Sequence, residues 1–269
     1  DANYTSDETT SAVEVDWGMK MTYDYYKNVH NRLSYDGKDS EILNFNNISN
    51  VFWGHGMNAG AIDYNDLVCM IYGNGRNADG EPILNPVVGV DVAGHEFSHL
   101  VINRNGLGGL VYQGESGAIN ESIADVFGAS VEFYTKINPN WFIGEGIVNN
   151  KPGFLRDMKN PNVRNMPDTY YGNFWFPTDS EDDKGGVHFN SSVGNYWFYL
   201  MSEGGSGTND FDYNYQVSPM GLDKAGKIVY RALMNYLTPD SNYYDYYFAT
   251  RQAVLDLYGN TESSEWKTL

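Results

Sequence analysis

Hydrophobic and polar positions follow two different periods along this chain, and they divide it into an early part rich in strands and a later part rich in helices. Residues 16–33 carry apolar side chains at helical spacing, which predicts an amphipathic helix. Residues 40–90 consist of short apolar runs separated by glycine-containing turns, a pattern typical of strands. Residues 1–15 are polar and rich in serine and threonine, with weak strand character.

Helical periodicity dominates the rest of the chain. It covers about 90–104, 117–136, 189–202, 221–237 and 243–258. The stretch over 137–187 contains five prolines and is expected to be mostly irregular, and so long an irregular stretch is usually functional or tied to an ion. We therefore predict an α+β fold with a β-rich lobe over residues 1–108 and a mainly α-helical lobe over residues 109–269.

The composition suits a folded chain with a sizeable core and argues against two classes of partner. The chain has 269 residues, of which 41% are hydrophobic, and its formal net charge is -18 at pH 7. Such an acidic chain repels nucleic acid and anionic membranes, and no apolar stretch approaches the roughly 18 residues that span a bilayer. The single cysteine, Cys69, lies in an apolar run and is expected to be a buried, unreactive thiol.

Residues 95–99 read His95-Glu96-Phe97-Ser98-His99 and carry the clearest chemistry in the chain. Positions i and i+4 of a helix share a face, so both imidazoles can reach one metal ion. Glu96 lies beside the pair, where a carboxylate can take a proton from a metal-activated water. The pattern predicts zinc and peptide-bond hydrolysis together, although so short a motif also recurs by chance.

A catalytic zinc needs a third protein ligand, and Glu121 is the best candidate. It lies in the segment Asn120-Glu121-Ser122-Ile123-Ala124-Asp125, one glycine-rich loop after His99. Asp125 lies four residues later on the same helix face, where it can accept the free N–H of a ligating histidine and fix its tautomer. The alternative is that both acids belong to a solvated helix face.

Three separated motifs together resemble the thermolysin family of secreted zinc endopeptidases. The motifs are His95–His99, Gly114–Glu121 and Gly185–Ser191, with further similarity in Tyr23–Gly37 and Lys227–Pro239. Three motifs in the right order are far more specific than one pentapeptide. The resemblance implies a two-lobe, thermolysin-like zincin fold of the gluzincin type, with the zinc site in the cleft between the lobes. It also implies a secreted enzyme acting on peptide and protein substrates, and we expect a monomer.

The family's metal and proton-transfer roles can be carried over to matching positions. The resemblance implies that Zn²⁺ is held by His95, His99 and Glu121. Glu96 would be the general base that later delivers a proton to the leaving amine. This assignment agrees with the chemistry of zinc, because zinc lowers the pKa of a bound water toward about 7 and a nearby carboxylate can then take its proton.

Other matching positions imply stabilisation of negative charge on the substrate carbonyl oxygen. His188 matches the family's oxyanion histidine, and Tyr112 matches its neighbouring tyrosine. Asp183, five residues before His188, matches the acid that orients this histidine and favours its protonated form. Without the resemblance, His188 would be interpreted as an ordinary surface or core histidine.

Substrate binding is implied for a further set of residues. Asn50 and Val51 resemble the edge-strand segment that pairs with an extended substrate, and Arg156 matches an arginine that binds a substrate carbonyl. The positions that match the lining of the first primed-side pocket are Val92, Ile143, Ile147 and Leu155. All four are apolar, so we expect a preference for a bulky hydrophobic residue after the scissile bond. The alternative for these four is plain core packing.

Calcium is the second cofactor that the resemblance implies. Asp91, Glu132 and Glu145 match acidic ligands of the family's calcium site. Asn140 stands where the family often has an aspartate. Because the site loses negative charge through this change, we expect one Ca²⁺ rather than two.

Two competing classes of function remain open on the sequence. A zinc aminopeptidase shares the histidine pair and a downstream glutamate, but no motif for a free substrate N-terminus is apparent. An inactive relative kept as a binding module would be favoured by loss of Glu96 or His188, and both are present. The apparent insertion over 54–66 includes His55, which is expected to be a surface loop histidine.

Overall fold

The computed structural model describes residues 7–49, 56–65, 67–259 and 261–269. The chain forms two compact units, the first comprising residues 1–101 and 127–155 and the second residues 102–126 and 156–269. The first unit contains a three-stranded sheet and the second is mainly helical, so the predicted α+β fold class is confirmed. The expected lobe boundary between residues 108 and 109 stays a prediction.

The first helix, α1 (Asp7–His30), begins well before the predicted residue 16. The expected weak strand character is therefore wrong from Asp7 onward. Ser11, Val15 and Met19 are all buried at intervals of four residues, which is one face of a helix. The local preference of threonine and valine for strands is overridden because this face packs into the core of the first unit.

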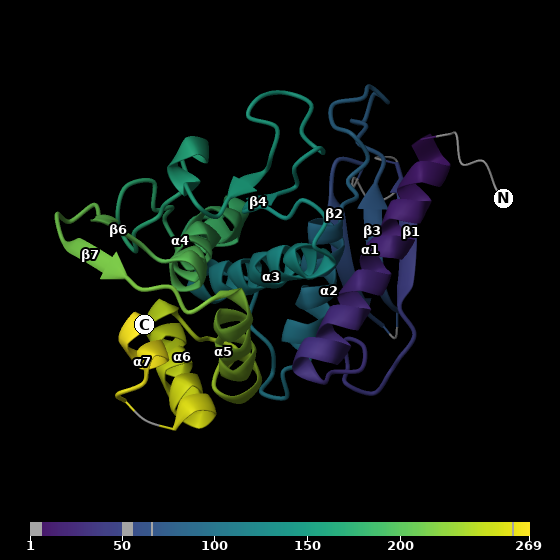
Figure 1. Ribbon diagram of the computed structural model, residues 1–269. Coiled ribbons are helices and arrows are strands. Elements are labelled where there is room, and N and C mark those ends of the chain that lie inside the picture. The colour runs from purple at the N-terminus through teal and green to yellow at the C-terminus, as the bar shows by residue number, and fades with distance from the viewer. Residues whose placement is uncertain (1–6, 50–55, 66, 260) are drawn as a thin grey trace. The chain divides into compact units, whose positions relative to one another are not determined.

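The sheet of the first unit has its strands in the order β1-β3-β2. The strands are β1 (Leu43–Ile48), β2 (Ala59–Tyr64) and β3 (Leu67–Gly73). The central β3 pairs in parallel with β1 and antiparallel with β2, so that Cys69 lies opposite both Leu43 and Ile62. Figure 1 shows α1 running beside this sheet. Cys69 is buried and unpaired by any disulfide, as predicted for a core thiol.

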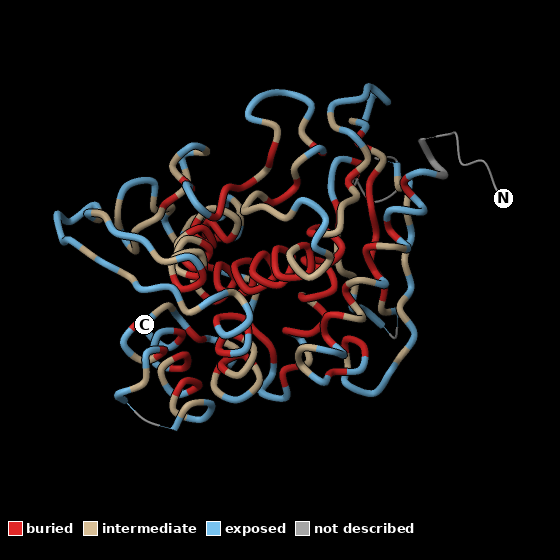
Figure 2. The backbone as a smooth tube through the Cα atoms, viewed as in Figure 1, coloured by how far each residue is buried: buried red, intermediate tan, exposed pale blue. Residues whose placement is uncertain are grey.

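Helices α2 (Val90–Asn103) and α3 (Gly114–Thr135) confirm two of the predicted helices, α3 beginning three residues earlier than expected. Most residues of both helices are buried (Figure 2). A Cβ on Gly94 of α2 would lie 3.0 Å from the Cα of Gly128 on α3, and a Cβ on Gly128 would lie 2.5 Å from the Asp91 carbonyl oxygen. The two glycines therefore allow the helix backbones to pack directly against each other.

The proline-rich stretch over 137–187 is mostly irregular, as predicted. Its regular elements up to residue 182 are the two-residue strands β4 (Phe142–Ile143) and β5 (Arg156–Asp157) and the 3-10 helix η1 (Pro161–Arg164).

Four helices and a hairpin complete the second unit. They are α4 (Asp183–Glu203), β6 (Gly205–Thr208), β7 (Asn214–Val217), α5 (Leu222–Asn235), α6 (Tyr243–Tyr258) and α7 (Ser264–Thr268). Helix α5 packs against α4 and α6, and α6 packs against α7 (Figure 1). Asn242 and Asp245 form a capping box at the start of α6, and Gly259 ends it in the left-handed region, so its predicted bounds are confirmed. Within the described ranges, no helix combines the length and hydropathy needed to cross a bilayer.

Candidate functional site

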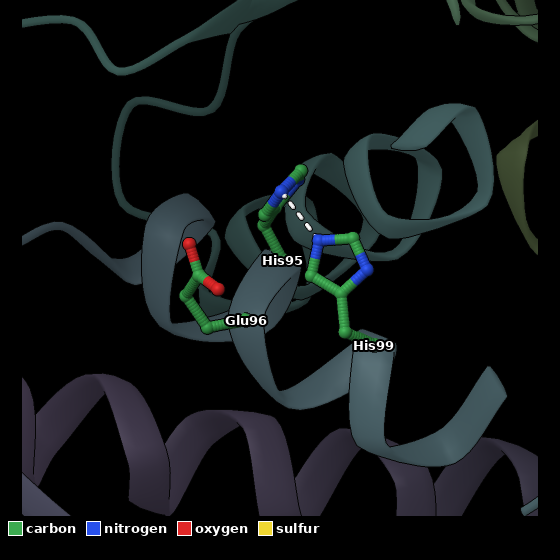
Figure 3. Close-up of side chains that lie close together, drawn as sticks. All are labelled: His95, Glu96 and His99. Carbon is green, nitrogen blue, oxygen red and sulfur yellow. Dashed lines mark hydrogen bonds between the residues drawn. The ribbon is translucent and has the colours of Figure 1, made fainter. Parts of the chain in front are cut away.

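The two histidines of the pentapeptide lie together on one face of α2. Their Nε2 atoms are 3.0 Å apart and their rings are nearly perpendicular. Figure 3 shows the two imidazoles close together, with Glu96 beside them on the same helix. Two nitrogens bound to one tetrahedral zinc at about 2.0–2.1 Å would lie roughly 3.3–3.4 Å apart. The observed pair is within a few tenths of an ångström of that separation, so the donor set fits zinc.

Glu96 completes the group. One donor atom from each of His95, Glu96 and His99 lies within 4.8 Å of the others, the single such group of three in the described part of the chain. His95 and Glu96 are both buried, so their side chains have little freedom to leave the group. The arrangement places a carboxylate close to any ion held by the two histidines.

Contacts around Ser98 hold this part of α2 in position. Its hydroxyl donates to the Gly94 carbonyl oxygen at 2.6 Å, and the Tyr26 hydroxyl lies 2.7 Å from Ser98 Oγ. Tyr26 also packs against Phe97. The sequence analysis did not predict Ser98 or Tyr26 as supporting residues. Helical spacing places Ser98 three residues after His95, on an adjoining part of the α2 surface, but nothing local identifies its partner on α1.

A second cluster of predicted site residues assembles within the second unit. The Tyr112 hydroxyl donates to Glu121 Oε1 and lies 3.2 Å from His188 Nε2. His188 Nε2 is itself 3.5 Å from Glu121 Oε1. Asp183 Oδ1 lies 2.5 Å from His188 Nδ1, and Asp183 Oδ2 accepts from the His188 backbone N–H. Tyr112, Glu121, His188 and Asp183 thus form one connected network.

The electrostatics of this network favour a protonated His188. Burial lowers the pKa of His188, but the hydrogen bond to Asp183 and the charge of Glu121 outweigh it, and the net shift is upward. The side chain still keeps 46% of its surface exposed. His188 can therefore present a proton to an exposed group while Asp183 holds the opposite ring nitrogen.

The loop before His188 depends on two glycines. Gly185 and Gly186 have φ of 83° and 74°, in the left-handed region. A Cβ on Gly185 would lie 2.4 Å from the Thr178 carbonyl oxygen, and one on Gly186 would lie 2.5 Å from the Phe176 Cβ. Glycine is required at both positions for conformation and for space. The regular part of α4 begins only after this bend, near the predicted residue 189.

Lys184, in the same bend, is a neighbour that the sequence analysis missed. Its Nζ lies 5.0 Å from the centroid of the Tyr112 ring, within the range of a cation–π contact. No sequence signal points to this contact, because it joins residues 72 positions apart.

Asp125 and Arg156 form a buried ion pair. Asp125 Oδ2 and Oδ1 accept from Arg156 Nε and Nη2, both at 2.6 Å, and Asn195 Nδ2 donates to Asp125 Oδ2 at 2.8 Å. Asn195 was not predicted, although its position seven residues after His188 places both on one face of α4. The predicted bond from Asp125 to a ligating histidine, and the contact of Arg156 with substrate, stay predictions.

The four residues predicted to line a hydrophobic pocket all belong to the first unit. Val92, Ile143 and Ile147 are buried and Leu155 is half-buried. Their burial agrees equally with core packing, so the pocket stays a prediction. Asn50 and Val51, the predicted substrate strand, lie outside the described residues, as does His55.

The predicted calcium ligands gather in one acidic cluster in the first unit. Asn140 Nδ2 donates to Glu132 Oε1 at 3.1 Å and to Glu145 Oε1 at 2.6 Å. The Oε2 atoms of Glu132 and Glu145 are buried and find no hydrogen-bond partner among the described residues. Burial and the charge of Glu145 raise the pKa of Asp91 to about 6, and burial with the charges of Glu145 and Asp91 raises the pKa of Glu132 to about 9. Buried carboxylates that repel each other and keep unpaired oxygens fit a divalent cation.

Comparison with known proteins gives a consistent result over nearly the whole chain. Residues 1–103 match the family described as thermolysin metallopeptidase, catalytic domain, and residues 108–268 match thermolysin metallopeptidase, alpha-helical domain. The thermostable neutral protease NprT of Geobacillus stearothermophilus is 43% identical over 97% of this chain. Thermolysin of Alicyclobacillus acidocaldarius is 42% identical over the same share. The chain spans 44% of the length of each of these two relatives.

A solved structure agrees with these matches. The precursor of protealysin, a metalloproteinase from Serratia proteamaculans, aligns with a TM-score of 0.68 and 25% identity, covering 99% of this chain and 78% of that one. The two family matches and the relatives above 40% identity agree on one family. The chain belongs to the thermolysin family of metallopeptidases.

Proposed function

We propose that this protein is a zinc-dependent endopeptidase that hydrolyses internal peptide bonds. The observation that carries the proposal is the His95–His99 pair, whose Nε2 atoms lie 3.0 Å apart with the Glu96 carboxylate beside them. The whole protein's activity is inferred from this group together with family membership.

We propose His95, His99 and Glu121 as the zinc ligands. Glu121 is buried and hydrogen-bonded by Tyr112, so its carboxylate is held in one orientation. Two imidazoles and one carboxylate are the protein ligands of an open catalytic zinc site, whereas closed structural sites are rich in cysteine. When bound, zinc polarises water and the substrate carbonyl.

The chain's own residues supply the proton transfers. Glu96 accepts a proton from the attacking water and passes it to the nitrogen of the leaving amine. His188, held protonated by Asp183, and the Tyr112 hydroxyl donate to the substrate oxygen as negative charge develops on it. Because Asp183 holds the His188 ring in place, these donors need little reorganisation during the reaction.

Substrate binding is proposed to combine backbone and side-chain recognition. Arg156, held by Asp125, which also accepts from Asn195, donates to a substrate carbonyl, and residues 50 and 51 pair with an extended substrate backbone. Val92, Ile143, Ile147 and Leu155 line a pocket for a bulky hydrophobic residue after the scissile bond. The substrates are peptides and proteins, and secretion of the protein is proposed from its family alone.

Calcium is proposed to stabilise the first unit. Asp91, Glu132, Asn140 and Glu145 would hold the ion through oxygen atoms, the ligands that Ca²⁺ prefers. The unpaired buried Oε2 atoms of Glu132 and Glu145 support this assignment. A bound cation would offset the repulsion among the three carboxylates.

The test is cleavage of an internally quenched peptide with both ends blocked, alongside zinc content. Glu96→Ala should keep zinc and lose nearly all activity, while Glu203→Ala, an exposed glutamate on α4, should behave as wild type. A chelator should abolish wild-type activity and added zinc should restore it. Wild-type turnover by Glu96→Ala would refute the mechanism. Activity only on peptides with a free N-terminus would favour the aminopeptidase alternative.

A further inference from the structure

Lys184 places an exposed positive charge beside the proposed oxyanion donors of a strongly acidic chain. Its Nζ lies over the face of the Tyr112 ring, 5.0 Å from the ring centroid. The hydroxyl on that ring lies 3.2 Å from His188 Nε2, and all three residues belong to the second unit. The ammonium is therefore nearer to the Tyr112 hydroxyl than the Debye length of about 10 Å at 0.1 M salt, so its charge acts on a ligand held there.

The acidic residues that precede Lys184 in the chain leave its ammonium without an ion-pair partner. Asp183 Oδ1 lies 2.5 Å from His188 Nδ1, and its Oδ2 accepts from the His188 backbone N–H. Glu181 and Asp182 are exposed, where water and salt screen their charges. Among the described residues, no carboxylate oxygen lies within 4.0 Å of Lys184 Nζ. The ammonium is thus available to a carboxylate that a ligand brings.

A second cation near the same network is already neutralised. Arg156 is buried, and its Nε and Nη2 atoms both donate to Asp125 at 2.6 Å. Its charge is therefore committed to a buried ion pair within the protein. Of these two cations, Lys184 is the one that can form a new ion pair with a ligand.

The backbone at residue 184 does not explain why a lysine stands there. Lys184 has φ of 51° and ψ of 41°, in the left-handed region that glycine and asparagine adopt most readily. The following Gly185 donates its backbone N–H to the Asp182 carbonyl oxygen at 3.0 Å, so the bend carries the side chain on a fixed backbone. A residue in an unfavourable conformation beside an active site points to a use of its side chain.

We propose that Lys184 selects substrates with an acidic side chain on the residue immediately before the scissile bond. The inference rests on the proposed function, in which Tyr112 and His188 donate to the carbonyl oxygen of that residue. A side chain leaves from the Cα next to its own carbonyl carbon, so a glutamate carboxylate at this position can reach a cation beside Tyr112. The residue after the scissile bond is assigned to the proposed apolar pocket, which leaves the acidic preference to the residue before it.

The test compares two blocked, internally quenched peptides that differ only in glutamate or glutamine before one cleavable bond. Phenylalanine follows that bond in both peptides, and mass spectrometry checks that both are cut there. The wild-type protein should show a kcat/KM about threefold higher for the glutamate peptide at low salt, the size of an exposed ion pair. The preference should disappear at 1 M salt, where the Debye length is about 3 Å.

Variants at residue 184 separate charge selection from structural support. Lys184→Gln should remove the preference for the glutamate peptide, Lys184→Arg should keep it, and Lys184→Glu should make the glutamine peptide the better substrate. A lysine that only supported the Tyr112 ring would change kcat/KM for both peptides equally and leave their ratio unaltered. Lys227→Gln, at an exposed lysine of α5, is the matched control and should behave as wild type.

Binding without turnover separates this proposal from the proposed function. The same two peptides are titrated by calorimetry into zinc-loaded Glu96→Ala, with and without Lys184→Gln. The glutamate peptide should bind about threefold more tightly, and only where Lys184 is present. If the wild-type protein cleaves neither peptide, the endopeptidase function fails and the ratio of the two Kd values alone decides the role of Lys184.

Two results would overturn the proposal and leave the endopeptidase function standing. One is cleavage and binding of the two peptides with equal kcat/KM and equal Kd at low salt. The other is a preference for the glutamate peptide that Lys184→Gln leaves unchanged, which would assign the preference to another group.

Discussion

The buried pair of Asp125 and Arg156 allows a quantitative test of how the second unit is held together. Asp125 has no exposed side-chain surface and Arg156 has 10%, and two bonds of 2.6 Å join them. Burial lowers the pKa of Arg156, but the charge and hydrogen bonds of Asp125 raise the pKa by more than burial lowers it. The guanidinium therefore stays charged. Asp125→Asn would leave that charge buried without its hydrogen-bonded counter-charge.

Removing one partner of a buried ion pair costs about 3–5 kcal/mol, which lowers the ratio of folded to unfolded protein by roughly 10²–10⁴. The measurement is urea unfolding at equilibrium in a Glu96→Ala background, which prevents self-digestion. Asp256→Asn, which breaks the exposed pair with Arg231, is the matched control and should change stability much less.

A double variant separates the charge from the packing. Asp125→Leu with Arg156→Met removes both charges, and apolar residues in place of a buried pair are often tolerated. The double variant should therefore be more stable than Asp125→Asn alone. The reasoning is wrong if Asp125→Asn costs less than about 1 kcal/mol, the range of exposed pairs, or if the double variant is the less stable of the two.

Three further predictions follow from the site. His188→Ala should lower kcat about 10²–10³-fold with little change in KM, and an unchanged kcat would remove it from the oxyanion role. The pKa of His188 is raised despite burial, chiefly by Asp183, so its protonated form persists above its usual pH range. Asp183→Asn should move the alkaline limb of kcat/KM to lower pH, and an unmoved limb would contradict this. Calcium at 100 times its Kd should stabilise the protein by about 2.7 kcal/mol and so raise its thermal midpoint. In Glu132→Gln, calcium should no longer raise the thermal midpoint. A rise that persisted in Glu132→Gln would place calcium elsewhere.

Some features of the fold could be predicted because they depend on neighbours within a few residues. The bounds of α6 follow from the Asn242 cap and from Gly259, and the shared face of His95 and His99 follows from their i, i+4 spacing. The start of α1 could not be predicted in this way, because residues 7–15 are mostly polar and become helical through burial of Ser11 and Val15 in the core.

The same limit applies to the groups around the site. Asn195 is an ordinary helical asparagine in the sequence, and its bond to Asp125 depends on how α4 packs against α3. Lys184 contacts Tyr112 only because Gly185 and Gly186 bend the chain before α4.

The sequence by itself determined the His-Glu-x-x-His pentapeptide, the helix that presents it and the identity of the chemical groups, because helix geometry relates residues one turn apart whatever surrounds them. Only the tertiary structure decided which distant groups meet. It brought residues 91, 132, 140 and 145 into one acidic cluster and placed the Lys184 ammonium over the ring of Tyr112. The physical reason is that burial and pairing depend on which distant segments of the chain pack together in the folded protein. The spacing of residues within one segment does not specify this packing.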